Sequence, residues 1–210
     1  MTVHVIILAA GDGKRFQVEG EPRVSKPLVK FVGETLIERA VNFWGCSKTI
    51  VNVVCHVGVA WVVRENQFLN GLSEVIYTQP GPGMSALLLG GGIPEDSEVI
   101  IADCDNVFLE RGVLPTSARE LIDEVSLCNA DVVVAYTHLR DDENTSQYCN
   151  LWLRKVGGGH YIINNITEKA VNCPVREAGV GIYYFKRWST FRKAACGKFA
   201  LLDEGRELSM

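Results

Sequence analysis

Residues 3–15 read VHVIILAAGDGKR, and this stretch decides how the chain folds. Its first eight residues are almost continuously apolar, which is typical of a central strand in a parallel sheet that is covered on both faces. A turn with two glycines and two cations follows directly, from Gly11 to Arg15. We therefore expect a buried strand that delivers a glycine-rich turn to the edge of a sheet.

The glycine-rich turn has the composition of a phosphate-binding loop. Gly11 and Gly13 let backbone N–H groups approach phosphate oxygens, and Lys14 and Arg15 can neutralise their charge. The spacing matches neither the dinucleotide-binding fingerprint nor the P-loop. An ordinary turn with solvated cations explains these residues equally well. Lys26, just before Pro27 in an extended segment, favours the phosphate site because it can reach back toward the same phosphates.

Short β-branched runs alternate with longer amphipathic runs in the first half, which predicts a three-layer α/β/α sandwich with a mixed, mostly parallel sheet. We expect strands at 3–10, 49–55, 74–78, 98–102 and 130–136, and helices at 34–44, 59–69, 85–89 and 118–128. After about Cys149 the pattern indicates a hairpin of 151–155 with 161–166, a strand at 181–185 and a helix at 188–195. We interpret the chain as one domain, with a nucleotide-binding half (1–140) and a substrate-side elaboration (141–210).

Composition excludes several classes of protein. The 210 residues are 47% hydrophobic and carry a net charge of −4, so one core is expected and no basic stripe for nucleic acid is present. No apolar run reaches membrane-spanning length, and no amino-terminal signal is visible, so we expect a cytosolic protein without a membrane partner. The seven scattered cysteines have no C-x-x-C spacing and are interpreted as reduced thiols. The four histidines lack ligand spacing and are interpreted as structural or surface residues.

Two carboxylates follow the strand predicted at 98–102. Asp103 and Asp105 alternate in an extended chain, so we expect both to project from the same side of that strand. Two such carboxylates can share a Mg²⁺ with phosphate oxygens. Asp103 could instead support the ligand or line the substrate pocket. Solvated loop aspartates are the alternative, since a D-x-D pair alone is weak.

The strings LAAGDGKRF (8–16) and SKPLVKFVGETLIERAV (25–41) closely resemble the amino-terminal signature of sugar nucleotidyltransferases. This resemblance implies a Rossmann-like fold of the glycosyltransferase-A type. It also implies that Arg15 and Lys26 are catalytic, and that Asp105 holds the metal. The residues implied to bind the nucleotide are Leu8, Ala9, Ala10, Gly11, Gly13, Lys14, Gln79, Gly83 and Ser85.

The substrate side of the resemblance is less complete. Family members carry an EKP motif before a glycine-rich strand, and here Glu168, Lys169 and Gly181 match it, with Ala170 in place of proline. Together with Asp103, they are expected to face the sugar phosphate; a surface Glu-Lys pair is the alternative. A second metal-binding aspartate is expected further downstream, but Asp203 lacks the family's surrounding pattern.

The sequence favours nucleotidyl transfer from an NTP to a sugar 1-phosphate and leaves other activities open. Cytidylyl transfer to phosphocholine or another non-sugar phosphate fits the same loop. A metal-dependent glycosyltransferase would use Asp103 and Asp105 but generally lacks the G-x-G-K-R turn. Because the second aspartate is missing, an inactive regulatory domain is a further alternative. Gln79 can hydrogen-bond several bases, so the sequence does not identify the nucleobase. Homo-oligomer formation is also left open, with the carboxy-terminal segment as a candidate contact.

Overall fold

The structure is a computed structural model that describes residues 2–10, 24–65, 72–77, 92–106, 117–157 and 160–199. The chain forms two compact units, one made of residues 1–133 with 183–210 and the other of residues 134–182. Strands β7 (Val132–His138) and β10 (Glu177–Phe185) run through both units. The interpretation as one domain with a boundary near residue 140 stays a prediction.

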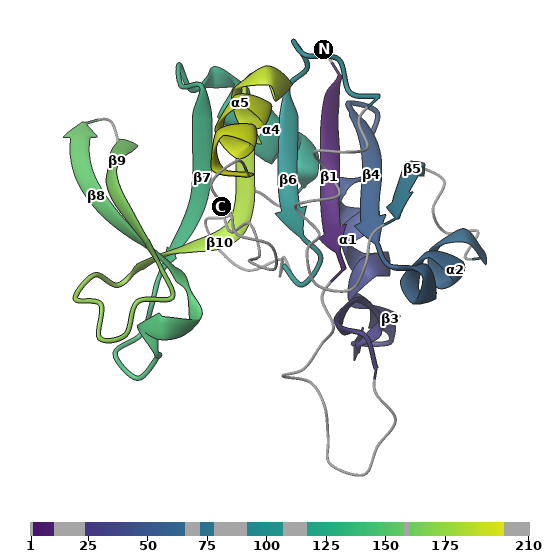
Figure 1. Ribbon diagram of the computed structural model, residues 1–210, viewed down its shortest axis with the longest axis horizontal. Coiled ribbons are helices and arrows are strands. Elements are labelled where there is room, and N and C mark those ends of the chain that lie inside the picture. Colours follow the sequence, from purple (N-terminus) through teal and green to yellow (C-terminus); the bar gives the residue numbers. More distant parts are fainter. Residues whose placement is uncertain are drawn as a thin grey trace. The chain divides into compact units, whose positions relative to one another are not determined.

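Four parallel strands form the sheet of the first unit, in the order β5-β4-β1-β6 (Figure 1). Strand β1 is central, and Val5, Ile6 and Ile7 are completely buried, as expected for a strand covered on both faces. The predicted parallel α/β sheet is therefore confirmed. The four strands are β1 (Val3–Ala9), β4 (Thr49–Cys55), β5 (Leu72–Tyr77) and β6 (Val99–Asp103).

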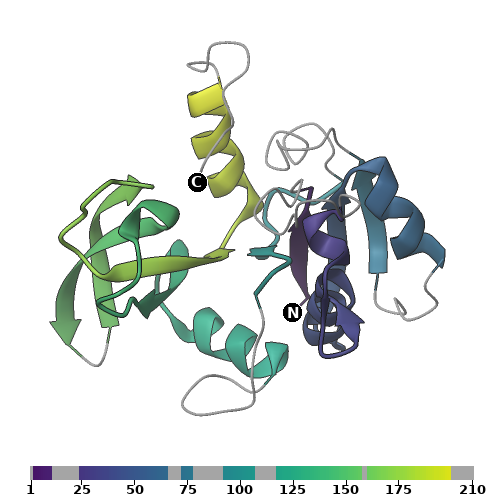
Figure 2. The same ribbon diagram turned by 90° about the horizontal axis from the view of Figure 1, so that it is seen from below.

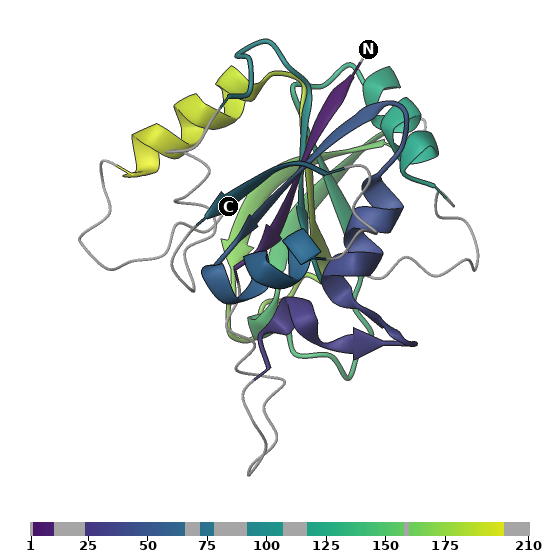
Figure 3. The same cartoon turned by 90° about the vertical axis from the view of Figure 1, so that its right-hand side faces the viewer.

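Helices cover both faces of this sheet. Figure 3 shows α5 on one face and α1 and α4 on the opposite face. Trp188 and Phe191 of α5 stack with ring centroids 4.9 Å apart and join Ile6 of β1 in one buried cluster. The helices are α1 (Leu36–Trp44), α2 (Val57–Glu65), α4 (Ala118–Leu127) and α5 (Trp188–Phe199). Residues 66–69 of one predicted helix and all of the helix predicted at 85–89 lie outside the described residues.

Helix α1 begins at a capping box. The Thr35 hydroxyl accepts a hydrogen bond from Glu38 N (3.2 Å), and the Glu38 carboxylate accepts one from Thr35 N (2.7 Å). This exchange satisfies two N–H groups that have no partner inside the helix. The prediction that the helix begins at Glu34 is wrong by two residues, because Glu34 and Thr35 form strand β3. Strand β3 pairs with β2 (Lys30–Phe31), and two-residue strands show no periodicity in the sequence.

Antiparallel strands dominate the second unit and appear in green in Figure 2. Strand β8 (Cys149–Gly157) pairs with β9 (His160–Glu168), and near its start with β10 at Ala178 and Gly179. The predicted hairpin is confirmed, with strands longer than the sequence pattern indicated. In hydrogen-bonding order the strands of the chain run β5-β4-β1-β6-β10-β8-β9, with β7 paired to β10.

A buried asparagine organises one end of the second unit. Asn150 is completely buried, and its amide nitrogen donates to the carbonyl oxygens of Thr145 (3.0 Å), Tyr148 (3.1 Å) and Thr167 (3.4 Å). Thr145 belongs to a short 3-10 helix, η3 (Thr145–Gln147). One side chain thus ties the segment before β8 to the end of β9.

The same network reaches the turn after β9. The Thr145 hydroxyl accepts from Cys173 N (3.2 Å) and lies 3.4 Å from the carbonyl oxygen of Ala170. Lys169 N donates to Tyr148 O at 2.9 Å, and Lys169 itself has a positive φ of 50°. The segment around Lys169 is therefore held by backbone and buried side-chain hydrogen bonds rather than by exposed contacts.

Across the described part of the chain, we find no helix with both the length and the apolar character that a membrane crossing requires.

Candidate functional site

The carboxyl ends of three parallel strands of the first unit meet at one edge of its sheet. Leu8 of β1 pairs with Val54 of β4 on one side and with Asp103 of β6 on the other. The pairing with β6 continues beyond the strand, because Cys104 N donates to Leu8 O at 3.2 Å. Ligands of open α/β sheets bind at this edge. Leu8, which is predicted to contact the nucleotide, is thus adjacent in the backbone to Asp103, two residues before the predicted metal ligand Asp105.

Asp103 and Asp105 do not alternate along one strand as expected. Strand β6 ends at Asp103, and Cys104 and Asp105 form a turn. Asn106 closes the turn, because both its backbone N (3.5 Å) and its side-chain amide (3.3 Å) lie against the carbonyl oxygen of Asp103. The expectation that one extended strand carries both carboxylates is therefore wrong.

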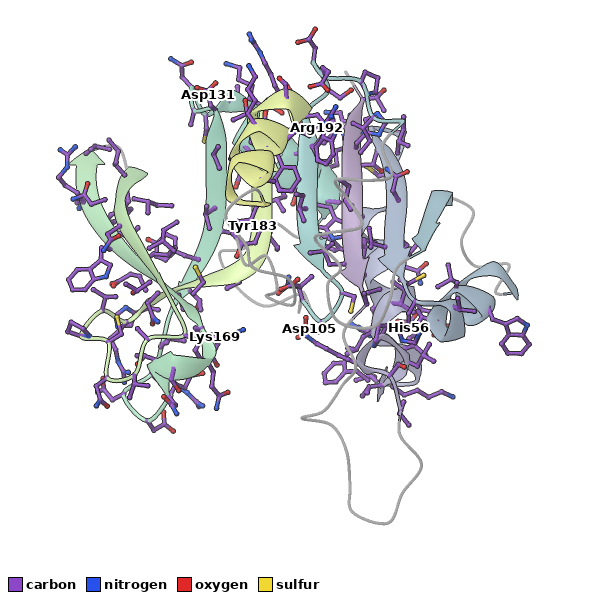
Figure 4. The ribbon with its side chains drawn as sticks, viewed as in Figure 1. His56, Asp105, Asp131, Lys169, Tyr183 and Arg192 are labelled. Carbon is purple, nitrogen blue, oxygen red and sulfur yellow. The ribbon has the colours of Figure 1, made fainter. Side chains whose placement is uncertain are left out.

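Lys26 lies directly against Asp105. The Lys26 Nζ atom is 2.6 Å from Asp105 Oδ2, and the two side chains are 28% and 35% exposed. Lys26 begins the 3-10 helix η2 (Lys26–Leu28), where Val29 N donates to Lys26 O at 3.1 Å and Pro27 fixes the backbone. Figure 4 labels Asp105 just beyond the end of β6. The structure thus brings together a cation and a carboxylate that are far apart in the sequence, and leaves both partly open to solvent.

Cys104, between the two aspartates, has a buried and unreactive thiol. It is 3% exposed, and burial, followed by the charge of Asp105, raises the pKa of its thiol to about 12. The thiol is therefore neutral near pH 7, whereas nucleophilic and metal-binding cysteines act as thiolates. The polar chemistry at this edge comes from Lys26 and the aspartates.

His56 supports the segment that carries Lys26. It follows β4 directly, at the same edge of the sheet, and its Nε2 lies 3.1 Å from the Ser25 hydroxyl. A side chain at Gly58 would lie within 3.3 Å of the imidazole, so glycine leaves room for the ring. This contact is consistent with the interpretation of His56 as a structural or surface residue. The sequence does not predict the partner, Ser25.

Comparison with known proteins gives the family. A model of the MobA-like NTP transferase domain matches residues 5–161. The chain belongs to this family. The matched range covers residues 5–15 of the first strand and turn, and it includes both Lys26 and Asp105. The resemblance to sugar nucleotidyltransferases is confirmed by this family and by the fold. No curated protein sequence matches the chain significantly.

Solved structures share the fold of this MobA-like transferase. A UDP-glucose pyrophosphorylase in complex with UDP-glucose aligns with a TM-score of 0.67 and 18% identity over 89% of this chain and 76% of its own. The inositol-1-phosphate CTP transferase of T. maritima aligns at 0.66 and 15% identity over 99% and 78%. A Bacillus anthracis protein described as a glucose-1-phosphate thymidylyltransferase aligns at 0.65 and 18% over 88% and 71%. The predicted Rossmann-like nucleotidyltransferase fold is confirmed.

Several predicted site residues of this MobA-like domain are not tested by the structure. The residues that lie outside its described part are Gly11, Gly13, Lys14, Arg15, Gln79, Gly83 and Ser85. Ala9 and Ala10 are buried at the end of β1. Their predicted roles, like that of Leu8, remain predictions.

The predicted substrate residues of the EKP region belong to the second unit. Glu168 ends β9, where its backbone pairs with Cys149. Lys169 follows it, with an exposed side chain. Gly181 has a φ of 71° within β10, in the left-handed region that strongly favours glycine. The structure thus gives a backbone reason for this glycine, and its predicted contact with substrate stays a prediction.

A metal at the Asp105 site would depend on substrate for most of its ligands. Among the residues described, no three His, Cys, Asp or Glu side chains gather into a metal-binding group. Mg²⁺ commonly binds with one or two carboxylates, several waters and substrate phosphates. Asp105, which is 35% exposed at the edge of the sheet, would provide one such oxygen ligand. The residues present therefore fit a Mg²⁺ ion that enters together with a triphosphate.

The Ser25–His56 contact predicts a measurable coupling at this site. We expect His56→Leu and Ser25→Ala each to lower kcat/KM about fivefold, because each loses one hydrogen bond that holds the segment before Lys26. The double variant should lose little more than either single variant, since both remove the same contact. Ser47→Ala, at an exposed serine between α1 and β4, is the control. Additive losses in the double variant would show that the contact does not position Lys26.

Proposed function

We propose that the chain transfers a nucleoside monophosphate from an NTP to a sugar 1-phosphate or a similar small phosphorylated acceptor, releasing pyrophosphate, in the synthesis of activated sugars or surface polysaccharide. The 2.6 Å contact between Lys26 and Asp105 carries the proposal, because it joins a phosphate-binding cation to a candidate metal ligand. Membership of an NTP transferase family supports a triphosphate substrate over a nucleotide-sugar donor.

The reaction is an in-line displacement at the α-phosphorus of the NTP. An oxygen of the acceptor phosphate forms the new bond to this phosphorus, and the bond to the oxygen that bridges to the β-phosphorus breaks. The leaving pyrophosphate carries away the electron pair, and no proton transfer is needed when the acceptor reacts as its anion. Such a reaction requires positioning and charge stabilisation more than covalent catalysis by the protein.

Lys26 supplies that stabilisation in the proposed mechanism. Asp105 holds its ammonium group at the edge of the sheet before any substrate arrives, so little reorganisation is needed when phosphate binds. The partial exposure of both side chains leaves phosphate oxygens free to approach Lys26 Nζ. A Mg²⁺ ion held by Asp105 would neutralise phosphate charge. Arg15 is proposed to stabilise charge during transfer, as the sequence resemblance implies.

The acceptor is proposed as a class rather than as one compound. Two of the similar structures are named for sugar metabolism, and a third is a CTP transferase for inositol 1-phosphate. A non-sugar phosphate therefore stands as the second candidate, in line with the alternative of phosphocholine. All of these acceptors present the same nucleophile, a phosphate monoester.

Pyrophosphate release tests the proposal. The full chain is assayed with Mg²⁺ and each of CTP, UTP, dTTP, GTP and ATP against sugar 1-phosphates, inositol 1-phosphate and phosphocholine. We expect release with one NTP and one acceptor class, and its loss in Asp105→Asn, which removes the charge of the proposed metal ligand with little change in size. Asp123→Asn, at an exposed aspartate on α4, should keep full activity. Failure of every NTP to bind would refute nucleotidyl transfer by this chain.

A further inference from the structure

The second unit contains a cavity whose lining includes none of the residues assigned to the proposed reaction. Its volume is about 610 Å³, within the range of roughly 300–1,000 Å³ typical of small-molecule sites. Its lining residues come from β7, β8, β9, β10 and Val175, and each of these residues belongs to the second unit. The shape and chemistry of this cavity therefore depend on residues of the second unit.

Three aromatic side chains dominate this cavity and remain partly exposed. Tyr136, Trp152 and Tyr161 are 41%, 37% and 43% exposed. The two tyrosine rings have centroids 6.1 Å apart and planes inclined by 73°, so they meet edge to face and form a corner. Covering apolar surface of this kind stabilises a complex through the hydrophobic effect. The corner thus offers aromatic surface for the apolar faces of a ligand.

Polar groups stand beside the aromatic corner. His138 Nδ1 lies 3.3 Å from Glu177 Oε1, which leaves the second carboxylate oxygen of Glu177 able to accept from a ligand. Asn165 Oδ1 accepts from Ile166 N at 2.9 Å, so its NH₂ group can still donate. Burial, followed by Tyr161 and Glu177, raises the pKa of Tyr136, so its hydroxyl stays protonated at neutral pH. The cavity therefore offers both hydrogen-bond donors and hydrogen-bond acceptors to a ligand.

Cationic side chains do not contribute to this lining. Within the described residues of the second unit, neither lysine nor arginine lines the cavity, and its acidic group is Glu177. A phosphate or carboxylate ligand would be placed beside a carboxylate with no fixed positive charge to balance it. The lining thus favours a neutral ligand that has apolar faces and several hydroxyl groups.

We propose that the cavity lined by Tyr136, Trp152, Tyr161 and Glu177 is a binding site for a neutral sugar ring, separate from the phosphate chemistry of Lys26 and Asp105. The ring's C–H faces pack on the aromatic side chains. Its hydroxyl groups donate to Glu177 and accept from Asn165. A sugar bound in this way carries no phosphate, so it is not the acceptor of nucleotidyl transfer.

Binding to the full chain is measured by titration calorimetry and saturation-transfer NMR. The probes are glucose, galactose, N-acetylglucosamine and maltose, with glucose 1-phosphate and AMP as charged comparators. We expect saturable binding of at least one neutral sugar. Trp152→Ala should weaken it about tenfold, the loss of roughly 1.4 kcal/mol of contact, and Glu177→Gln several-fold. Trp61→Ala is the matched control, since Trp61 is 63% exposed on α2 of the first unit.

Three results would overturn the inference. They are the absence of saturable binding for every neutral probe, equal losses in the Trp152 and Trp61 variants, and a dependence on Trp152 for AMP or glucose 1-phosphate instead. If Trp152→Ala fails to fold, as judged by circular dichroism, Tyr161→Ala and Glu177→Gln decide. None of these readouts requires nucleotidyl transfer, so they test the inference independently of the proposed enzyme activity.

Discussion

We expect the Lys26→Met variant to lose about 10²- to 10³-fold in kcat/KM for nucleotidyl transfer, the scale seen when one preorganised charge-stabilising donor is removed. Methionine keeps an unbranched apolar side chain but removes the ammonium group that lies 2.6 Å from Asp105. The effect should be far larger on activity than on stability, because a partly exposed ion pair contributes at most about 1 kcal/mol to folding. Steady-state kinetics and urea unfolding of the same preparation check both parts.

The control for this variant lies four residues away. Lys30, on the exposed short strand β2, carries the same charge, and Lys30→Met should keep kcat/KM within about twofold, since surface substitutions usually have small effects. Lys26→Arg keeps the charge but changes its geometry, so it should recover only part of the activity. Equal kinetics for the Lys26→Met and Lys30→Met variants would remove Lys26 from the mechanism.

The central fold was predictable because it is local in sequence. The apolar run of β1 and the amphipathic runs that follow it determine which segments are strands and which are helices. Helix α1 shows where this information ends. The capping box of Thr35 and Glu38 sets its first residue, while the β2–β3 hairpin converts Glu34 to strand. Such boundaries depend on pairing between short segments, which periodicity does not reveal.

The candidate site was predictable in part for a similar reason. Lys26 and Asp105 were identified separately, Lys26 as a residue able to reach the phosphate loop and Asp105 as a carboxylate that follows a strand. Their direct contact depends on tertiary structure, and so does the turn that ends β6 at Asp103. The hydrogen bond between His56 and Ser25, 31 residues apart in the sequence, also depends on tertiary structure and was not predicted. Spacing rules detect clusters of ligands but not single supporting contacts.

The buried network of the second unit was also invisible in the sequence. Asn150 lies in a strand whose neighbours are apolar, and nothing in its context distinguishes a buried asparagine from an exposed one. The structure shows why an amide is needed, because three backbone carbonyl oxygens converge on its nitrogen. Lys169, the predicted phosphate contact of the substrate side, is bonded through its backbone to Tyr148, one of the residues that Asn150 holds. Stability and the placement of a predicted substrate residue are therefore linked.

Replacing Asn150 should cause the largest loss of stability. We expect Asn150→Leu to lower the free energy of unfolding by about 3 kcal/mol, because it removes three hydrogen bonds from a completely buried amide, at about 1 kcal/mol for each bond. Urea denaturation measures the loss. Asn129→Ala, at an exposed asparagine, should change stability by less than about 0.5 kcal/mol. If Asn150→Leu lowers the free energy of unfolding by less than about 1 kcal/mol, the value of a single hydrogen bond, the network is dispensable for stability.

Asn150→Asp separates the hydrogen bonds from the packing. A carboxylate of the same shape would face carbonyl oxygens with no hydrogen to donate, and burial would raise its pKa in the folded state above the unfolded value of about 3.9. The folded state then binds the proton more tightly, so the variant is best tolerated below about pH 4 and loses stability as the pH rises above that value. Measured relative to the native chain at each pH, the destabilisation should therefore grow from pH 4 to pH 7. A destabilisation that stays constant with pH would show that the carboxylate escapes to solvent and that the amide is not enclosed by its three acceptors.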